Sequence, residues 1–148
     1  MTVVRSHKDD ADFLTLVDQL DASLRITDGA DHAFYNQFNG TDTLDAVALL
    51  LDQDKVVACG AYRIKNDRQV EIKRMFTLPS HRQQGCAKQV LMALEQWASA
   101  AGFSEAILET GINQIEALAF YPKVGYQQIP NFAPYVGVKN SFCFGKKL

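Results

Sequence analysis

The sequence predicts an α/β fold in which one mixed, mostly antiparallel sheet of about six to seven strands has helices on both faces. Two β-rich runs at 44–51 and 56–64 are separated by turn-forming residues, and a third run follows at 70–77, which is typical of consecutive antiparallel strands. A long amphipathic helix then leads to a strand at 105–110, and a helical crossover of this kind joins parallel strands. We therefore expect a central parallel pair of strands.

One domain accounts for the whole chain. Its 148 residues, 47% of them hydrophobic, can bury a substantial core, and no linker or repeat divides residues 1–148. In chain order we expect a strand at 3–7, a helix at 10–24, a polar and aromatic segment with at most a short helix at 26–39, the three strands above, a helix at 87–101, the strand at 105–110, a helix at 114–123 and strands at 126–129 and 141–146. Asp9 or Asp10 would cap the first helix. Its expected inward side chains are Phe13, Leu14, Leu16, Val17 and Leu20.

Charge and hydropathy argue against several classes of function. The net charge is −2 and the isoelectric point is near 5.9, so the chain lacks the basic surplus of a nucleic-acid-binding domain. No apolar run approaches the roughly 20 residues of a membrane span, and the N-terminal residues lack the apolar core of a signal peptide. We therefore expect a cytoplasmic protein with no nucleic-acid or membrane partner.

The cysteines Cys59, Cys86 and Cys143 are odd in number and far apart. This spacing fits neither a zinc site nor a disulfide framework, so we expect reduced thiols and no metal. Cys86 needs separate consideration, because a thiol at a helix N-terminus has a lowered pKa and can act as a nucleophile. His81 lies across a turn and no histidine follows it, so a catalytic Cys86 is disfavoured.

The stretch from 70 to 91 places a strand, a Pro-containing turn and an amphipathic helix end to end. The turn and the start of the helix contain Arg82, Gln83, Gln84, Gly85, Cys86 and Ala87. Gly85 permits a tight backbone turn and the small Ala87 permits close approach of a ligand, so several N–H groups can point at one phosphate. The alternative is that Gly85 only makes the turn and that Arg82 is a solvated surface cation.

Over nearly its full length, the chain resembles the GNAT superfamily of acyl-CoA-dependent N-acetyltransferases. Residues 82–87 fit the family's R/Q-x-x-G-x-G/A pyrophosphate loop, and 72–78 fit the strand that binds pantetheine. A second motif, A-x-x-L/F-Y-x-x-x-G-F/Y, is matched by Ala117, Phe120, Tyr121, Gly125 and Tyr126. The segments LETG at 108–111 and FYPKVGY at 120–126 are similar to a bacterial branch of small members whose substrates are unassigned.

This resemblance implies that acetyl-CoA is the co-substrate and that the central parallel strands splay around it. Its diphosphate would lie on Gln83, Gln84, Gly85, Cys86 and Ala87 beside Arg82, and its pantetheine along Met75, Phe76 and Thr77. The backbone N–H of Phe76 would hold the oxyanion that forms when an amine attacks the thioester directly. The family often has Asn at the position of Gln114, so Gln114 and its neighbour Asn113 are candidate contacts of the pantetheine or of a bridging water.

The resemblance also implies catalytic roles for Tyr121 and Glu71. Tyr121 occupies the position of a general acid that protonates the departing thiolate; the alternative is a packing residue between helix and sheet. Glu71 precedes Arg82 by 11 residues, as the catalytic base does in the histone acetyltransferase branch, and burial could raise its pKa. The alternatives are an ion pair with Lys73 or a chain of water molecules as the base.

The acceptor is expected to bind between the loop at 26–43 and the hairpin at 130–140. These segments contain aromatic side chains but no dense charged cluster, which favours a small-molecule amine or an amino-acid-like acceptor. Candidate substrate-binding residues are Tyr35, Glu109 and Tyr135. Glu109 and His32 are also lesser candidates for the base.

Two other functions stay open at this point. A non-catalytic acyl-CoA-binding regulatory module would keep the phosphate-binding turn without a productive acid, and a plain interaction domain would bind no CoA. The strands near the C-terminus also leave a homodimer open.

Overall fold

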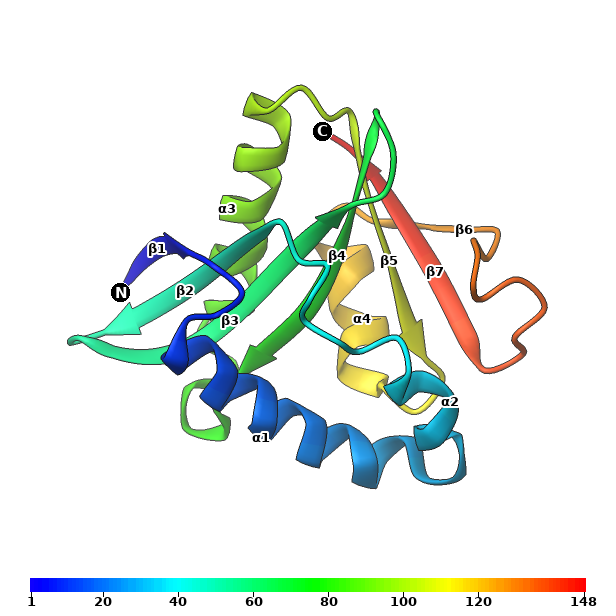
Figure 1. Ribbon diagram of the computed structural model, residues 1–148, viewed down its shortest axis with the longest axis horizontal. Helices are drawn as coiled ribbons and strands as arrows, with labels where there is room; N and C mark the ends of the chain where they lie inside the picture. Colours follow the sequence, from blue (N-terminus) through cyan, green and yellow to red (C-terminus); the bar gives the residue numbers. More distant parts are fainter.

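The computed structural model describes all 148 residues as one seven-stranded sheet with helices on both faces (Figure 1). The elements are β1 (Thr2–Ser6), α1 (Ala11–Asp28), η1 (Gly29–Asp31), α2 (His32–Asn36), β2 (Ala46–Asp52), β3 (Lys55–Ile64), β4 (Gln69–Thr77), η2 (Pro79–His81), α3 (Cys86–Ala100), β5 (Glu105–Gly111), α4 (Ile115–Lys123), β6 (Gln127–Ile129) and β7 (Ser141–Lys147). The strand order is β1-β2-β3-β4-β5-β7-β6, and only β4 and β5 pair in parallel. The predicted fold class is confirmed.

Local chemistry explains where the elements begin and turn. Asp10 caps α1 by accepting a hydrogen bond from the Phe13 backbone N–H at 3.0 Å, which satisfies one donor of the first turn. Gln53 and Asp54 connect β2 to β3 with φ values of 50° and 68°. Two consecutive residues with positive φ match the right-handed twist of a hairpin.

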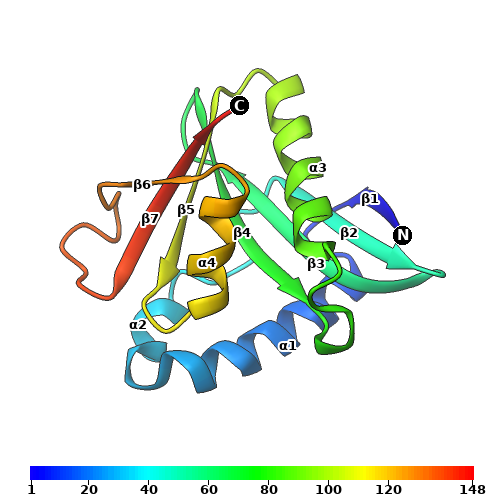
Figure 2. The ribbon, with the colours of Figure 1, turned by 180° about the vertical axis from the view of Figure 1, so that it is seen from behind.

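The two faces of the sheet carry different helices. Helices α1 and α2 lie on one face, and α3 and α4 lie on the other (Figures 1 and 2). The larger core cluster packs α3 and α4 against the sheet through Val90, Leu91, Leu94 and Tyr121. A smaller cluster packs α1 against the opposite face through Phe13, Leu16 and Val17. No helix combines the length and the hydropathy that a membrane crossing requires.

The parallel pair of strands is short and then opens. Residues 69–71 of β4 pair with 105–107 of β5, and beyond them the two strands have no further pairing. Figure 1 shows the carboxyl ends of β4 and β5 diverging. In open α/β sheets, ligands bind at such carboxyl ends.

A bulge in β4 lies beside this opening. Cys59 pairs with Phe76 but Ala61 pairs with Lys73, so β4 has an extra residue opposite Gly60. Arg74 takes up the bulge with a φ of 58°, a conformation that costs a non-glycine residue about 1–2 kcal/mol. A Cβ on Gly60 would come within 2.3 Å of the Met75 sulfur. Glycine therefore leaves room for the Met75 side chain between β3 and α3.

The structure differs from the predicted elements at several boundaries. The first helix continues past residue 24 to Asp28 and ends at Gly29, whose φ is 55°. The predicted inward position of Leu14 is wrong: its side chain is 38% exposed, because it lies about 100° around the helix from Phe13. β2 begins at Ala46 rather than at residue 44, and β6 begins at Gln127 rather than at residue 126.

Candidate active site

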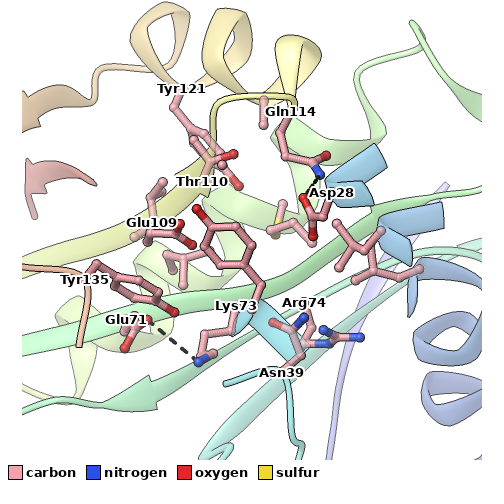
Figure 3. Close-up of a pocket in the computed structure, with 18 residues that line it drawn as sticks. Asp28, Asn39, Glu71, Lys73, Arg74, Glu109, Thr110, Gln114, Tyr121 and Tyr135 are labelled. Atoms are coloured by element: carbon pink, nitrogen blue, oxygen red, sulfur yellow. Dashed lines mark hydrogen bonds and ion pairs between the residues drawn. The ribbon is translucent and has the colours of Figure 1, made fainter. Parts of the chain in front are cut away.

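A cavity of about 160 Å³ lies where β4 and β5 separate (Figure 3). Ala117 and Tyr121 of α4 line it from one face of the sheet, and Asp28 of α1 and Tyr35 of α2 line it from the other. The opening between the strands therefore joins the two faces. A ligand bound on the α3 and α4 side can meet a second ligand bound on the α1 and α2 side.

The start of α3 offers a set of free backbone donors next to this opening. None of the N–H groups of residues 83–88 has an acceptor in the protein. Gln83 and Gly85 have φ values of 61° and 77°, and alternating backbone geometry of this kind turns successive N–H groups toward one point. The turn therefore fits a diphosphate, with the helix dipole adding attraction.

The side chains of the turn leave that backbone accessible. Gln83 and Gln84 are exposed, and Gln84 donates a hydrogen bond from its amide to the Ser80 carbonyl at 3.3 Å. The Arg82 guanidinium donates from Nε to the Thr77 carbonyl at 3.2 Å and lies 5.7 Å from the Phe76 ring centre. Arg82 is therefore held against the end of β4, with its charge beside the turn.

Cys86 is the first residue of α3, and Ala87 follows it half-buried. The Cys86 side chain is 2% exposed, and its thiol donates to the His81 carbonyl at 3.3 Å. Burial raises the pKa of this thiol, so Cys86 is a packing residue and not an activated nucleophile.

Residues Met75, Phe76 and Thr77 form the last part of β4, where no partner strand covers the edge that faces β5. Met75 lines the cavity, and all three side chains are half-buried. Gln114 also lines the cavity and donates from Nε2 to Asp28 Oδ1 at 3.1 Å. Asn113 is exposed and does not line the cavity.

Tyr121 is 7% exposed and faces the cavity from α4 (Figure 3). Its ring packs edge-to-face against Phe120 and Tyr126, with centres 5.1 and 5.6 Å away. Burial alone raises the pKa of its phenol above the usual range for tyrosine, so Tyr121 stays protonated at neutral pH and can donate a proton.

Glu71 is buried and fully paired. Its carboxylate accepts a hydrogen bond from Arg63 Nε at 2.8 Å and lies 3.8 Å from Lys73 Nζ. Lys73 in turn donates to the Phe38 carbonyl at 2.9 Å. Two cations therefore occupy the oxygens of Glu71.

Glu109 lies in the same cavity in a different electrostatic environment. No cation lies within ion-pair distance of it, and its Oε2 atom is buried without a hydrogen-bond partner. Burial raises the pKa of this carboxyl to about 7. A group with a pKa near 7 can both accept and release a proton at neutral pH.

Two tyrosines complete the wall on the α1 and α2 side. Tyr35 shares a 2.8 Å hydrogen bond with the Ser141 hydroxyl, and Tyr135 is 4% exposed; both line the cavity. They belong to a small aromatic cluster with Phe34, Phe38 and Phe132. His32 does not line the cavity.

Sequence reasoning missed two charged residues of the cavity, Asp28 and Arg74. Asp28 is 7% exposed at the end of α1, in a position that the prediction placed in a loop. Arg74 is 6% exposed, forms an ion pair with Asp21, and has an Nε donor without a partner. The sequence offered one signal for Arg74: an arginine within a strand that was expected to be buried, where a charged side chain is rare without a partner.

The chain matches proteins of known family. Residues 14–126 match the model of the Acetyltransferase (GNAT) family. An IAA acetyltransferase of Azospirillum brasilense is 40% identical over 81 residues, which cover 54% of this chain and 53% of that protein. The chain therefore spans about half the length of this curated relative.

Two solved structures extend the likeness over the full chain. A crystal structure from Klebsiella pneumoniae, described as an acyl-CoA N-acyltransferase, is 31% identical with a TM-score of 0.84, and the match covers 99% of this chain and 97% of that one. The PaiA N-acetyltransferase of Thermoplasma acidophilum, solved in complex with coenzyme A, has a TM-score of 0.72 at 15% identity with both chains covered completely. The second likeness concerns the fold alone.

Proposed function

Since this chain belongs to the GNAT family of acetyltransferases, we propose that it transfers an acetyl group from acetyl-CoA to a primary amine of a small molecule. The observation that carries this proposal is the juxtaposition of two features. Unpaired N–H groups at residues 83–88 lie at the start of α3, and a cavity with Glu109 and Tyr121 opens between β4 and β5. The first suits a diphosphate and the second suits acyl transfer.

The cofactor would extend from the turn into the cavity. Its diphosphate binds the N–H groups of Gln83, Gln84, Gly85, Cys86 and Ala87, near the charge of Arg82. Its pantetheine runs along the uncovered edge of Met75, Phe76 and Thr77, and the Phe76 N–H donates to the oxyanion. The complex of PaiA with coenzyme A supports this placement by analogy of fold.

We assign the base to Glu109 in preference to Glu71. Glu71 is occupied by Arg63 and Lys73, and taking up a proton would break a buried ion pair. Glu109 has a free oxygen in the cavity and a pKa of about 7. Glu71 would then position Lys73 at the wall of the cavity.

The acetyl transfer proceeds by direct attack. The nitrogen of a neutral amine forms a bond to the thioester carbonyl carbon, and its proton passes to Glu109. The C–S bond then breaks, and the Tyr121 phenol donates its proton to the departing sulfur. Glu109 releases its proton to solvent and Tyr121 regains one, so the protein returns to its initial state.

The proposal is tested by acetyl-CoA-dependent thiol release over a panel of amines, with acetylated product identified by mass spectrometry. We expect at least one amine to raise thiol release far above the rate without acceptor. A thermal shift with acetyl-CoA but no thiol release with any amine would instead identify an acyl-CoA-binding module. A ligand at 100 times its dissociation constant raises the free energy of unfolding by about 2.7 kcal/mol.

A further inference from the structure

The charged residues of the cavity are unequally paired. Each cation already has an anionic partner: Arg74 pairs with Asp21, and Lys73 lies beside Glu71. The two remaining carboxyl groups have no cationic partner. Asp28 accepts one hydrogen bond from the neutral amide of Gln114, and Glu109 has a buried oxygen with no partner. The cavity therefore lacks positive charge opposite these two groups.

Asp28 occupies a position that is unfavourable for a carboxylate in the protein alone. It is the last residue of α1 and is 7% exposed. The C-terminal end of a helix carries a partial negative charge, which repels an anion, and burial removes the solvation of that anion. Residues that break such a local rule are often found where a ligand supplies the missing partner.

Asp28 and Glu109 face the same part of the cavity. A Cβ built on Gly111 would lie 3.7 Å from Asp28 Oδ1 and 3.8 Å from the Tyr35 ring. Gly111 follows Glu109 by two residues along β5, so their positions share one side of the strand and are about 7 Å apart. The two carboxyl groups thus flank one short stretch of the cavity, with an aromatic ring beside them.

We propose that Asp28 is a specificity-determining residue that binds a second ammonium group of the acceptor, which would be a short α,ω-diamine. This inference rests on the proposed function, because it requires an amine acceptor. One amino group of the diamine attacks the thioester as a neutral amine and passes its proton to Glu109. The other stays protonated, forms a charge-assisted hydrogen bond with Asp28, and can contact the face of an aromatic ring.

The same observations argue against an acceptor with a carboxylate. Such a group would lie near Asp28 and Glu109, and like charges in a buried site repel strongly. The cations that could bind it are engaged with Asp21 and Glu71. The unpartnered Arg74 Nε donor offers such a carboxylate one hydrogen bond, but the repulsion from Asp28 and Glu109 opposes its binding.

Three acceptors of matched length separate these cases. They are 1,4-diaminobutane, butylamine and 4-aminobutanoate, whose far ends carry a positive charge, no charge and a negative charge. For the wild type we expect kcat/KM to be about tenfold to a hundredfold higher for 1,4-diaminobutane than for butylamine, the range of a hydrogen bond to a charged group. We expect 4-aminobutanoate to be the poorest acceptor.

The variant Asp28→Asn removes the charge and keeps an oxygen that can accept the Gln114 hydrogen bond. We expect it to reduce the ratio of kcat/KM between 1,4-diaminobutane and butylamine by about tenfold or more. The control is Asp31→Asn, because Asp31 lies three residues from Asp28, accepts a hydrogen bond from the Asn140 amide at 2.9 Å, and does not line the cavity. We expect this control to leave the ratio unchanged.

Several outcomes would overturn the inference while leaving the proposed function intact. These are a wild-type preference for butylamine or 4-aminobutanoate, or an unchanged ratio in Asp28→Asn. If no amine of the panel causes thiol release, the proposed function is overturned instead. A thermal-shift titration with 1,4-diaminobutane tests Asp28 without turnover: stabilisation of the wild type that Asp28→Asn loses would support diamine binding, and equal shifts of both proteins would refute it.

Discussion

Glu71 and Glu109 point to the same face of the sheet from the two strands of the parallel pair. Glu71 pairs in register with Ile107, so Glu109 lies two residues beyond, where β4 and β5 have separated. Arg63 and Lys73 surround Glu71, whereas Glu109 has no cation. Two carboxyl groups of one cavity therefore have different roles available to them: one holds cations, and the other can take up a proton.

The first prediction concerns the pH dependence of turnover. A base acts in its ionised form, so kcat/KM of the wild type, calculated on the concentration of neutral amine, should rise about tenfold per pH unit below the Glu109 pKa of about 7 and level off above it. Glu109→Gln should lower kcat/KM by about 10²–10⁴-fold and remove this rise. Initial rates measured across the pH range with a fixed amine provide the test.

Glu71→Gln is the matched variant for that profile. It removes an equivalent negative charge but leaves Glu109 in place, so the inflection near pH 7 should persist. An inflection that vanishes in Glu71→Gln and remains in Glu109→Gln would reverse the assignment of the base.

The second prediction concerns stability. The pKa of Glu109 in the folded protein, about 7, is above its ordinary 4.5, so the ionised form is disfavoured by folding. This cost is absent below pH 4.5 and complete above about pH 7, where it reaches about 3 kcal/mol at 1.36 kcal/mol per pKa unit. Glu109→Gln should therefore be more stable than the wild type at pH 8, and the difference should shrink as the pH falls.

Urea unfolding at pH 5 and at pH 8 measures this difference. We expect Glu109→Gln to be less active but more stable than the wild type at pH 8, because Glu109 serves function at a cost in stability. Equal stability of the two proteins at both pH values would mean that Glu109 is not desolvated in the folded state.

The third prediction concerns Tyr121. Tyr121→Phe keeps the ring in its aromatic cluster and removes the proton donor, so kcat should fall by about 10²-fold or more while KM for acetyl-CoA changes little. The matched control is Tyr126→Phe, which loses a 2.8 Å hydrogen bond to Glu95 outside the cavity. It should lower the free energy of unfolding by about 1.5–3 kcal/mol and keep kcat near the wild-type value. Near-normal turnover of Tyr121→Phe would make Tyr121 a packing residue.

The fourth prediction concerns the phosphate-binding turn. Gly85 has a φ of 77°, so Gly85→Ala should strain the turn by about 1 kcal/mol and raise KM for acetyl-CoA about tenfold by misdirecting the N–H groups. Gly102, with a φ of 98° at the other end of α3, is the matched control. Gly102→Ala should cost similar stability without changing KM. If both variants bind acetyl-CoA equally well, the turn is not the diphosphate site.

Most of the fold could be predicted because it depends on local patterns. β-rich runs separated by turn-forming residues predicted β2, β3 and β4, and the helical period of three to four residues predicted α3. The predicted ends of helices and strands were less accurate where the sequence pattern does not change sharply at the boundary. The first helix was predicted to end four residues early because residues 25–28 are mostly polar, whereas its end in the structure is set by Gly29.

The cavity was only partly predictable. Glu109 and Tyr121 were candidates because their motifs and strand positions are visible in the sequence. Asp28 could not be predicted, because its contact with Gln114 joins residues that are 86 positions apart. The bulge at Arg74 was also hidden, since nothing in the sequence of β4 marks the residue that adopts a positive φ.

The most direct test of the account follows the acetyl group and the thiol together. Wild type, Glu109→Gln and Tyr121→Phe would each be incubated with acetyl-CoA and 1,4-diaminobutane, with free thiol and acetylated amine measured in the same sample. The account predicts equal amounts of the two products from the wild type and a large, parallel loss of both in the two variants. Thiol release without acetylated amine, or no release with this or any other amine of the panel, would contradict it.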